Sequence, residues 1–132
     1  MASISSFEEF ECWQLAKRLD NDLFPLTKVN GFERDYKLKD QILGASGSIM
    51  DNIAEGFERG SNAEFIRFLT YSKGSCGEVR SQLHRAQDRG YINQDQFKNL
   101  YDQANFVRKK LGALMNYLKG SDIKGPRYKK SA

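Results

Sequence analysis

Proline, histidine and cysteine are scarce in this chain, which has two prolines, one histidine and two cysteines among 132 residues. Few prolines and few Val or Thr runs argue against a sheet protein. A di-iron centre in a helical bundle takes two Glu-x-x-His repeats, but His84 is the sole histidine and position 81 is serine. Cys12 and Cys76 lack metal-ligand, haem or redox spacing, so we expect core thiols. The sequence therefore predicts no metal, no cofactor and no enzyme.

Long apolar runs are also missing, and no stretch approaches the length that crosses a membrane. The first residues, MASISSFEEF, show no basic segment followed by an apolar one. We therefore expect no membrane association and a reduced, cytoplasmic protein. Aromatic residues are plentiful, with nine Phe, six Tyr and one Trp, so we do not expect a disordered chain. A length of 132 residues is sufficient for one domain with a buried core.

Apolar residues recur with a helical period in four segments, within 12–26, 38–53, 65–86 and 97–118. Ser61 with Glu64, and Asn93 with Gln96, have the spacing of helix-capping boxes. The segments are bounded by residues that end helices, Pro25, Gly90 and Gly120, and by a loop at VNGFERD. The pattern predicts an all-α fold, an antiparallel up-down four-helix bundle over residues 1–120, followed by a flexible basic tail at 121–132.

The stretch GASGS, residues 44–48, has small residues of the kind that cradle phosphates, but it lies inside a helical segment and lacks the strand and the lysine of such loops. A second small-residue set follows in KGSCGE. In a hairpin, Gly44 would face Gly77 and Gly47 would face Gly74, because both pairs of positions add to 121, with the turn beside Ser61. We expect these four glycines to mark the closest approach of two helices. The alternative is a groove there that admits a ligand backbone.

Charge is unevenly distributed along the chain. Residues 1–60 hold seven Lys/Arg and eleven Asp/Glu, whereas residues 61–132 hold fourteen and six. One interpretation is an anionic partner for the basic half, with phosphates bound by its cations and Tyr128 stacking on a base. The others are a solvated helix face, or attraction between subunits or helices. The candidate nucleic-acid-binding residues are Lys73, Arg80, Arg85, Arg108, Lys109, Lys110, Lys124, Arg127, Lys129 and Lys130, with His84 and Arg89 nearby.

Several stretches resemble a known family: FEEFECWQLA near the start, SIMDNIAEGFERGS at 48–61, FLTYSKGSCGEVRSQL at 68–83 and RGYI at 89–92. They are similar to the four-helix-bundle proteins encoded in intervening sequences of bacterial large-subunit ribosomal RNA genes. The most specific motif comprises Asn52, Glu55, Gly56 and Arg59, whereas Met50 stands where the family usually has proline. The resemblance implies a ring-like homopentamer without enzymatic activity. It also implies kinship with accessory proteins of diversity-generating retroelements, which bind nucleic acid and a reverse transcriptase.

The motif itself has two interpretations. Glu55 and Arg59 stand four residues apart, which favours an ion pair at the end of a helix, with Asn52 bonded across the hairpin. The alternative is a polar cluster for a partner. Five aromatic residues have no place in the four apolar stripes, and we expect them at a subunit interface: Phe57, Phe68, Tyr71, Phe106 and Tyr117. The sequence thus predicts an oligomeric nucleic-acid-binding accessory protein, or alternatively a homo-oligomeric scaffold for a protein partner.

Overall fold

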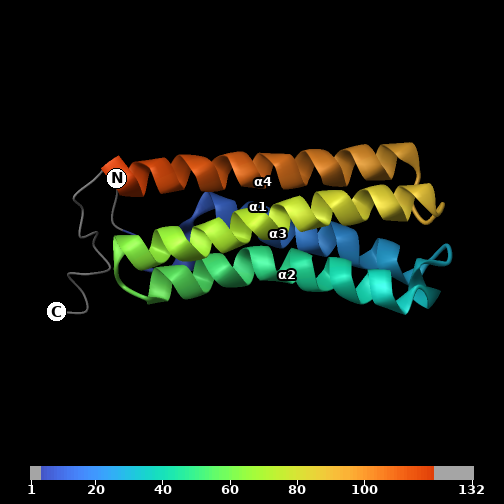
Figure 1. Cartoon of the computed structure of the whole chain (residues 1–132), viewed down its shortest axis with the longest axis horizontal. Helices are drawn as coiled ribbons and strands as arrows, with labels where there is room; N and C mark the ends of the chain where they lie inside the picture. Colours follow the sequence, from blue (N-terminus) through green and yellow to red (C-terminus); the bar gives the residue numbers. More distant parts are fainter. Residues whose placement is uncertain (1–3, 121–132) are drawn as a thin grey trace.

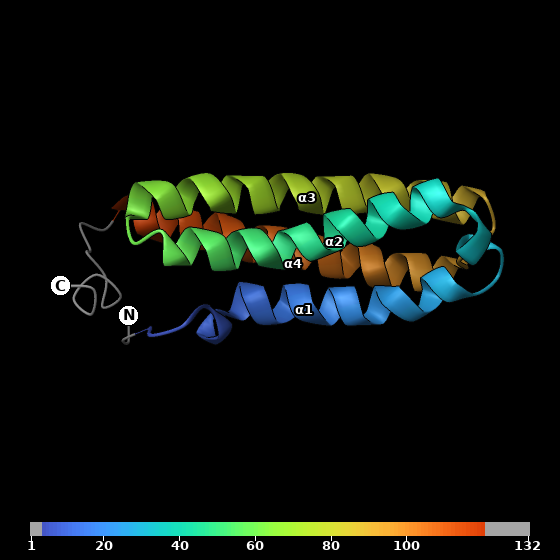
Figure 2. The same cartoon turned by 90° about the horizontal axis from the view of Figure 1, so that it is seen from below.

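Four long helices make up the computed structural model, which describes residues 4–120. They are α1 (Glu11–Leu23), α2 (Tyr36–Glu58), α3 (Asn62–Asp88) and α4 (Gln94–Gly120), with short 3₁₀ turns at Phe7–Glu9, Phe24–Lys28 and Phe32–Arg34 and no strand in this part of the chain. Consecutive helices run antiparallel, and α1 packs against α4 to close the bundle (Figures 1 and 2). The predicted fold class is confirmed. Residues 121–132, the predicted tail, lie outside the described residues.

The helix ends follow the sequence signals. At the start of α3 only half of the predicted capping box forms: Ser61 Oγ accepts a hydrogen bond from the Glu64 amide at 3.1 Å, whereas the Glu64 carboxylate accepts from Arg67 Nη2 at 2.7 Å. Asn93 and Gln96 form a complete capping box, in which each side chain accepts from the other residue's backbone amide. Pro25 lies just after α1, and Gly90 leaves α3 with a φ of 78°. No helix in the described range is long and apolar enough to cross a membrane.

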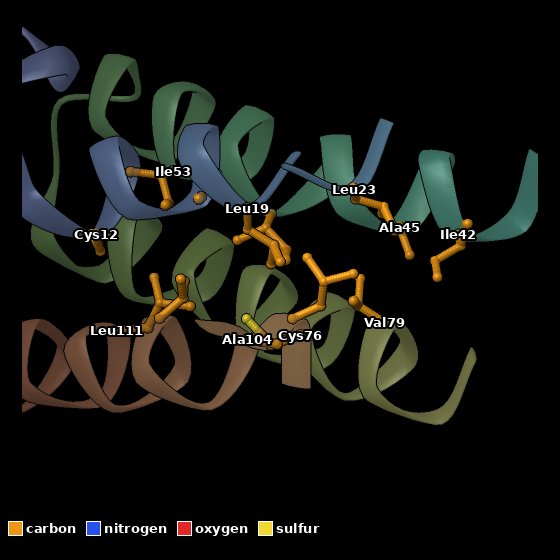
Figure 3. Close-up of a cluster of buried hydrophobic side chains, with 14 of the residues drawn as sticks. Cys12, Leu19, Leu23, Ile42, Ala45, Ile53, Cys76, Val79, Ala104 and Leu111 are labelled. Atoms are coloured by element: carbon orange, nitrogen blue, oxygen red, sulfur yellow. The ribbon is translucent and has the colours of Figure 1, made fainter. Parts of the chain in front are cut away.

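The predicted apolar stripes converge on one core in the middle of the bundle (Figure 3). Leu19, Ile49, Leu69 and Leu111, one from each helix, are completely buried. Burying one such side chain contributes about 1.5–3 kcal/mol, so the packed stripes account for most of the helices' stability. Both cysteines lie in this core, and burial raises the pKa of Cys12 and of Cys76 to about 12. Neither thiol is therefore ionised at neutral pH.

The α2–α3 hairpin has the predicted register but not the predicted glycine contact. Ser72 Oγ donates to the Ile49 carbonyl at 2.8 Å, and these positions also add to 121. Among residues 4–120, a Cβ atom built on Gly44, Gly47 or Gly74 meets nothing within 4 Å, and one on Gly77 meets only the end of the Arg80 side chain. The glycine prediction is therefore wrong. The constant sum of positions fixes the level along the helix axis but not the rotation about it, and the apolar stripes already occupy the inner face.

The close approach of α2 and α3 lies instead at Gly56, near the hairpin turn. A Cβ atom there would be 2.6 Å from Cβ of Phe68 and 3.0 Å from Cδ1 of Phe65. Contacts this short exclude any side chain without movement of the helices. Gly56 is thus the position in the family motif where glycine is required by packing.

The expected interface aromatics fall into three groups: buried, partly buried and exposed. Phe57 and Phe68 are 5% and 7% exposed, so their assignment to a surface is wrong. Phe57 packs edge-to-face on Phe10 and Phe65, because the turn Phe7–Glu9 contacts α2 and places Phe10 at this end of the bundle. Tyr117 is partly buried against the core. Tyr71 and Phe106 remain 47% and 46% exposed.

Asp35 links the α3–α4 turn to the start of α2. Its carboxylate caps α2 by accepting from the Leu38 amide at 3.2 Å, and accepts from Tyr91 Oη at 2.9 Å and Arg89 Nη1 at 2.7 Å. The Tyr91 hydroxyl, then the Leu38 amide and Arg89, hold the pKa of Asp35 below its ordinary value, and the same carboxylate raises the pKa of Tyr91.

These shifts predict a pH window for the contact. The stability from Asp35 is present above its unfolded pKa and is lost as pH falls through the lower folded pKa. The stability from Tyr91 is present below its unfolded pKa and is lost as pH rises through the higher folded pKa. We expect Asp35→Asn to lower the melting temperature at pH 7 and to lower it less at pH 3. Equal losses in melting scans at the two values would contradict the assignment.

Candidate nucleic-acid interface

The outer side of the α3–α4 pair gathers aromatic rings. His84 on α3 lies with its ring centroid 4.9 Å from Phe97 and 5.6 Å from Tyr101, both on α4. Phe97 and Tyr101, one helical turn apart, stack at 5.2 Å with an interplanar angle of 30°. His84 is exposed and both α4 rings are partly exposed. Aromatic faces at a surface of this kind are suited to stacking on nucleobases.

Two arginines continue this side toward the middle of the bundle. Arg80 lies one turn before His84, with its guanidinium carbon 5.9 Å from the Tyr101 ring centroid. Arg108 lies two turns after Tyr101 on α4, and this spacing puts it on the same face of the helix. The Nε atoms of Arg80 and Arg108 are buried without a hydrogen-bond partner among the described residues. Neither arginine forms an ion pair in that part of the chain.

Lys73 completes the same stripe of α3. It lies one turn before Gly77 and two turns before Arg80, and it is exposed. The contacts Arg80–Tyr101 and His84–Phe97 set the register of the hairpin, which puts Lys73 level with Arg108. We call the surface formed by Lys73, Arg80, His84, Phe97, Tyr101 and Arg108 the basic–aromatic face.

The other predicted cations lie elsewhere. Arg85 faces α2, where its Nη2 donates to Gln41 Oε1 at 3.0 Å. Lys110 faces α1, where it pairs with Glu11 at 3.2 Å and lies over the Phe106 ring. Lys109 is exposed and has no ion pair in the described range. The predicted cations therefore lie on different sides of the bundle. The remaining predicted residues are outside the described part of the chain: Lys124, Arg127, Tyr128, Lys129 and Lys130.

Two members of the basic–aromatic face did not emerge from the sequence as site residues. Phe97 is the first residue of the apolar pattern within 97–118, which predicts a core position, and Tyr101 lies outside that pattern; both rings pack partly buried against the core. The sequence feature that indicates a shared position for Phe97 and Tyr101 is their spacing of four residues, which puts two rings next to each other on one face of a helix. Their position opposite His84 depends on the register of α3 and α4, which periodicity alone does not determine.

The family motif has structural roles on the far end of α2. Arg59 pairs with Glu55 at 2.9 Å, as predicted, and its guanidinium lies over the Phe68 ring at 4.9 Å. Asn52 does not bond across the hairpin. Its Nδ2 donates to Ser48 on the same helix, and Ser48 Oγ then accepts from Ser75 Oγ of α3 at 3.1 Å. The motif therefore stabilises the hairpin.

No group of three or more His, Cys, Asp or Glu side chains in residues 4–120 has an arrangement that could hold a metal ion. A groove between α1 and α4 is lined by Leu15, Arg18 and Phe106, among others, and has a volume of about 320 Å³. Its lining also includes Asn99, Asp102 and Gln103, so it combines polar and charged side chains with one aliphatic chain and one aromatic ring.

The fold matches that of a solved bacterial protein. The crystal structure of a protein of unknown function from the S23 ribosomal protein family of Bacteroides thetaiotaomicron VPI-5482 superposes with a TM-score of 0.72. The match covers 80% of this chain and 95% of that one at 19% sequence identity, so it supports the fold alone. No curated protein matches the sequence. The family model of the 23S rRNA-intervening sequence protein matches residues 8–113, which is most of the sequence, and this chain therefore belongs to that family.

Proposed function

We propose that this protein is a non-enzymatic, oligomeric accessory protein of the cytoplasm that binds nucleic acid through the basic–aromatic face. The observation that carries the proposal is the pair Arg80 and Arg108, which belong to the basic–aromatic face and lack acidic partners in residues 4–120. Arg80 lies beside the stacked rings, and Arg108 lies two turns further along α4 from Tyr101. An arginine held by a carboxylate has its charge satisfied within the protein, whereas these two retain charge for phosphates.

The composition of the face favours single-stranded RNA or DNA. Cations track the phosphate backbone without reading sequence, and aromatic side chains stack on any base because every base has a π-face. Such a surface gives affinity with little sequence preference. Oligomerisation would repeat the face around the assembly and convert a weak contact into avidity.

The direct test is salt-dependent binding of the full-length protein to labelled single-stranded RNA and to duplex DNA of unrelated sequences. We expect binding of all sequences at low salt and a linear loss of log affinity with log salt, with a slope of about −0.7 per contacted phosphate on single strands and about −0.9 on duplex. Fluorescence anisotropy at several salt concentrations measures both quantities. Absence of binding at low salt would contradict the proposal.

The second candidate is a homo-oligomeric scaffold for a protein partner, and the exposure of Tyr71 and Phe106 favours it. Phe106 lies beside Leu15 at the α1–α4 groove, and exposed apolar side chains next to a groove are typical of interfaces. A pentamer would have five times the mass of the 15.1 kDa chain in light scattering. A stable oligomer that ignores RNA and DNA would favour the scaffold, and a monomer at micromolar concentration would contradict the oligomeric part of both candidates.

A further inference from the structure

A groove opens between α2 and α3, on the side of α3 opposite to α4. It has a volume of about 420 Å³ and is lined by Asp40, Gly44 and Ser48 of α2 and by Glu78, Gln82 and Arg85 of α3, among others. The groove contains one of the glycines of the GASGS stretch. Packing within residues 4–120 does not explain that glycine, because a Cβ atom on Gly44 would meet none of their atoms within 4 Å.

Glycine inside a helix lowers its stability, so its presence at an open position indicates a use for the space. A residue without a side chain lets a second chain come close to the helix backbone. Gly44 is exposed, and its absent side chain widens the groove next to Ser48, one turn further along α2.

Gln82 is the second observation at this site. Its side chain lines the groove, the residue is only 9% exposed, and its Oε1 accepts no hydrogen bond from any described residue. Buried amide oxygens are nearly always paired, and an unpaired one indicates that a donor belongs there.

The charges of the groove specify the donor. Asp40 and Glu78 are exposed carboxylates with no ion pair in the described part of the chain. The one cation of the lining, Arg85, already donates to Gln41. Carboxylate and amide oxygens without donors suit ammonium and guanidinium groups.

We propose that the groove binds the basic segment 121–132 of the same chain. This segment carries Lys124, Arg127, Lys129 and Lys130 against the single carboxylate of Asp122, which complements Asp40 and Glu78. The proposal does not depend on the function proposed above, although the same cations could not contact the groove and phosphates at once.

The position at which the segment leaves the bundle agrees with this assignment. Helix α4 ends at Gly120, and Asn62 Nδ2 at the start of α3 donates to the Leu118 carbonyl at 3.3 Å. The end of α4 and the α2–α3 turn therefore lie at the same end of the bundle (Figures 1 and 2). Measured along the axis of α2, Ser48 lies about 15 Å and Asp40 about 27 Å from Glu58, the last residue of the helix. Twelve extended residues span up to about 40 Å, which is sufficient.

The test uses the full-length protein with its tail cations neutralised (Lys124→Gln, Arg127→Gln, Lys129→Gln, Lys130→Gln) and a fluorescent peptide of residues 121–132. We expect the peptide to bind in anisotropy titrations at low salt. Adding Asp40→Asn and Glu78→Gln should weaken it about five- to tenfold, as expected for two exposed ion pairs. The matched pair Glu8→Gln and Asp95→Asn removes the same charge elsewhere and should leave the affinity unchanged.

Two further measurements separate the groove from general attraction. Gly44→Leu should abolish peptide binding while the melting temperature stays the same or rises, because leucine fills the groove at an exposed helix position. The unmodified chain should bind the peptide more weakly than the neutralised chain, by a factor independent of protein concentration. Docking within one chain would be overturned by any of four results. The first two are absence of peptide binding, and a control pair that weakens binding as much as Asp40→Asn with Glu78→Gln. The other two are peptide binding that Gly44→Leu retains, and competition from the chain's own segment that grows with protein concentration.

Discussion

Replacing Gly56 with alanine is expected to destabilise the bundle by about 1–3 kcal/mol. The new Cβ would lie 2.6 Å from Cβ of Phe68, an atom fixed by the α3 backbone, and 3.0 Å from the Phe65 ring. The ring cannot easily move either, because Phe65 is fully buried and packs on Phe10 and Phe57. Relief therefore requires α2 and α3 to separate at the end where Phe57 and Phe68 are buried. Urea unfolding followed by circular dichroism measures the change.

The matched control is Gly44→Ala on the same helix. Its Cβ would meet no atom of the described part of the chain within 4 Å, so only helix propensity changes, and we expect a gain of up to about 1 kcal/mol. Opposite signs for the two substitutions would assign the cost at Gly56 to packing. A loss at Gly44 comparable to that at Gly56 would show that glycine is needed for a reason common to the whole helix.

The contrast between Gly44 and Gly56 shows which parts of the fold the sequence predicts. Apolar residues at helical spacing identified the core, since Ile49, Leu69 and Leu111 are buried as their stripes required. Capping residues located the turns, and the constant sum of positions gave the α2–α3 register. None of these signals reports how far each helix is rotated about its axis. The glycines of GASGS were consequently placed at the correct level and on the wrong face.

The same limit applies to the candidate site. Net charge along the chain identified the basic half, but the structure sends Arg85 toward Gln41 and Lys110 toward Glu11. Whether two arginines from different helices share one face depends on the rotation of both helices. An ion pair with a carboxylate far away in the sequence also leaves a cation less available to bind phosphates. The sequence therefore identifies the cations but does not determine which of them share one face of the bundle.

The position of Arg80 and Arg108 on the basic–aromatic face leads to the prediction for nucleic-acid binding. The double substitution Arg80→Glu and Arg108→Glu is expected to weaken binding to all sequences and to reduce the magnitude of the log–log salt slope by about 1.4 on single strands or about 1.8 on duplex, for two phosphates lost. The matched control, Arg85→Glu with Lys110→Glu, changes the net charge equally on other sides of the bundle. We expect the control to retain most of the slope.

Because the Nε atoms of both arginines are buried, charge reversal could also disturb packing. Arg80→Gln with Arg108→Gln avoids a buried negative charge and should lose the same part of the slope, with circular dichroism confirming the helical content. Equal effects of the basic–aromatic pair and the control pair would show that binding depends on total charge. That result would remove the assignment to this face.

Tyr101 distinguishes stacking from charge on the same face. Tyr101→Ala removes a ring that stacks on Phe97 and lies near Arg80, but it removes no cation. Single-strand affinity should therefore fall by about 1–3 kcal/mol, the contribution of one stacked base, with the salt slope unchanged. Duplex affinity should change little, because paired bases are not available to the ring. If single strands and duplex lose affinity equally, the ring acts only by positioning Arg80, and the face binds phosphates without contacting bases.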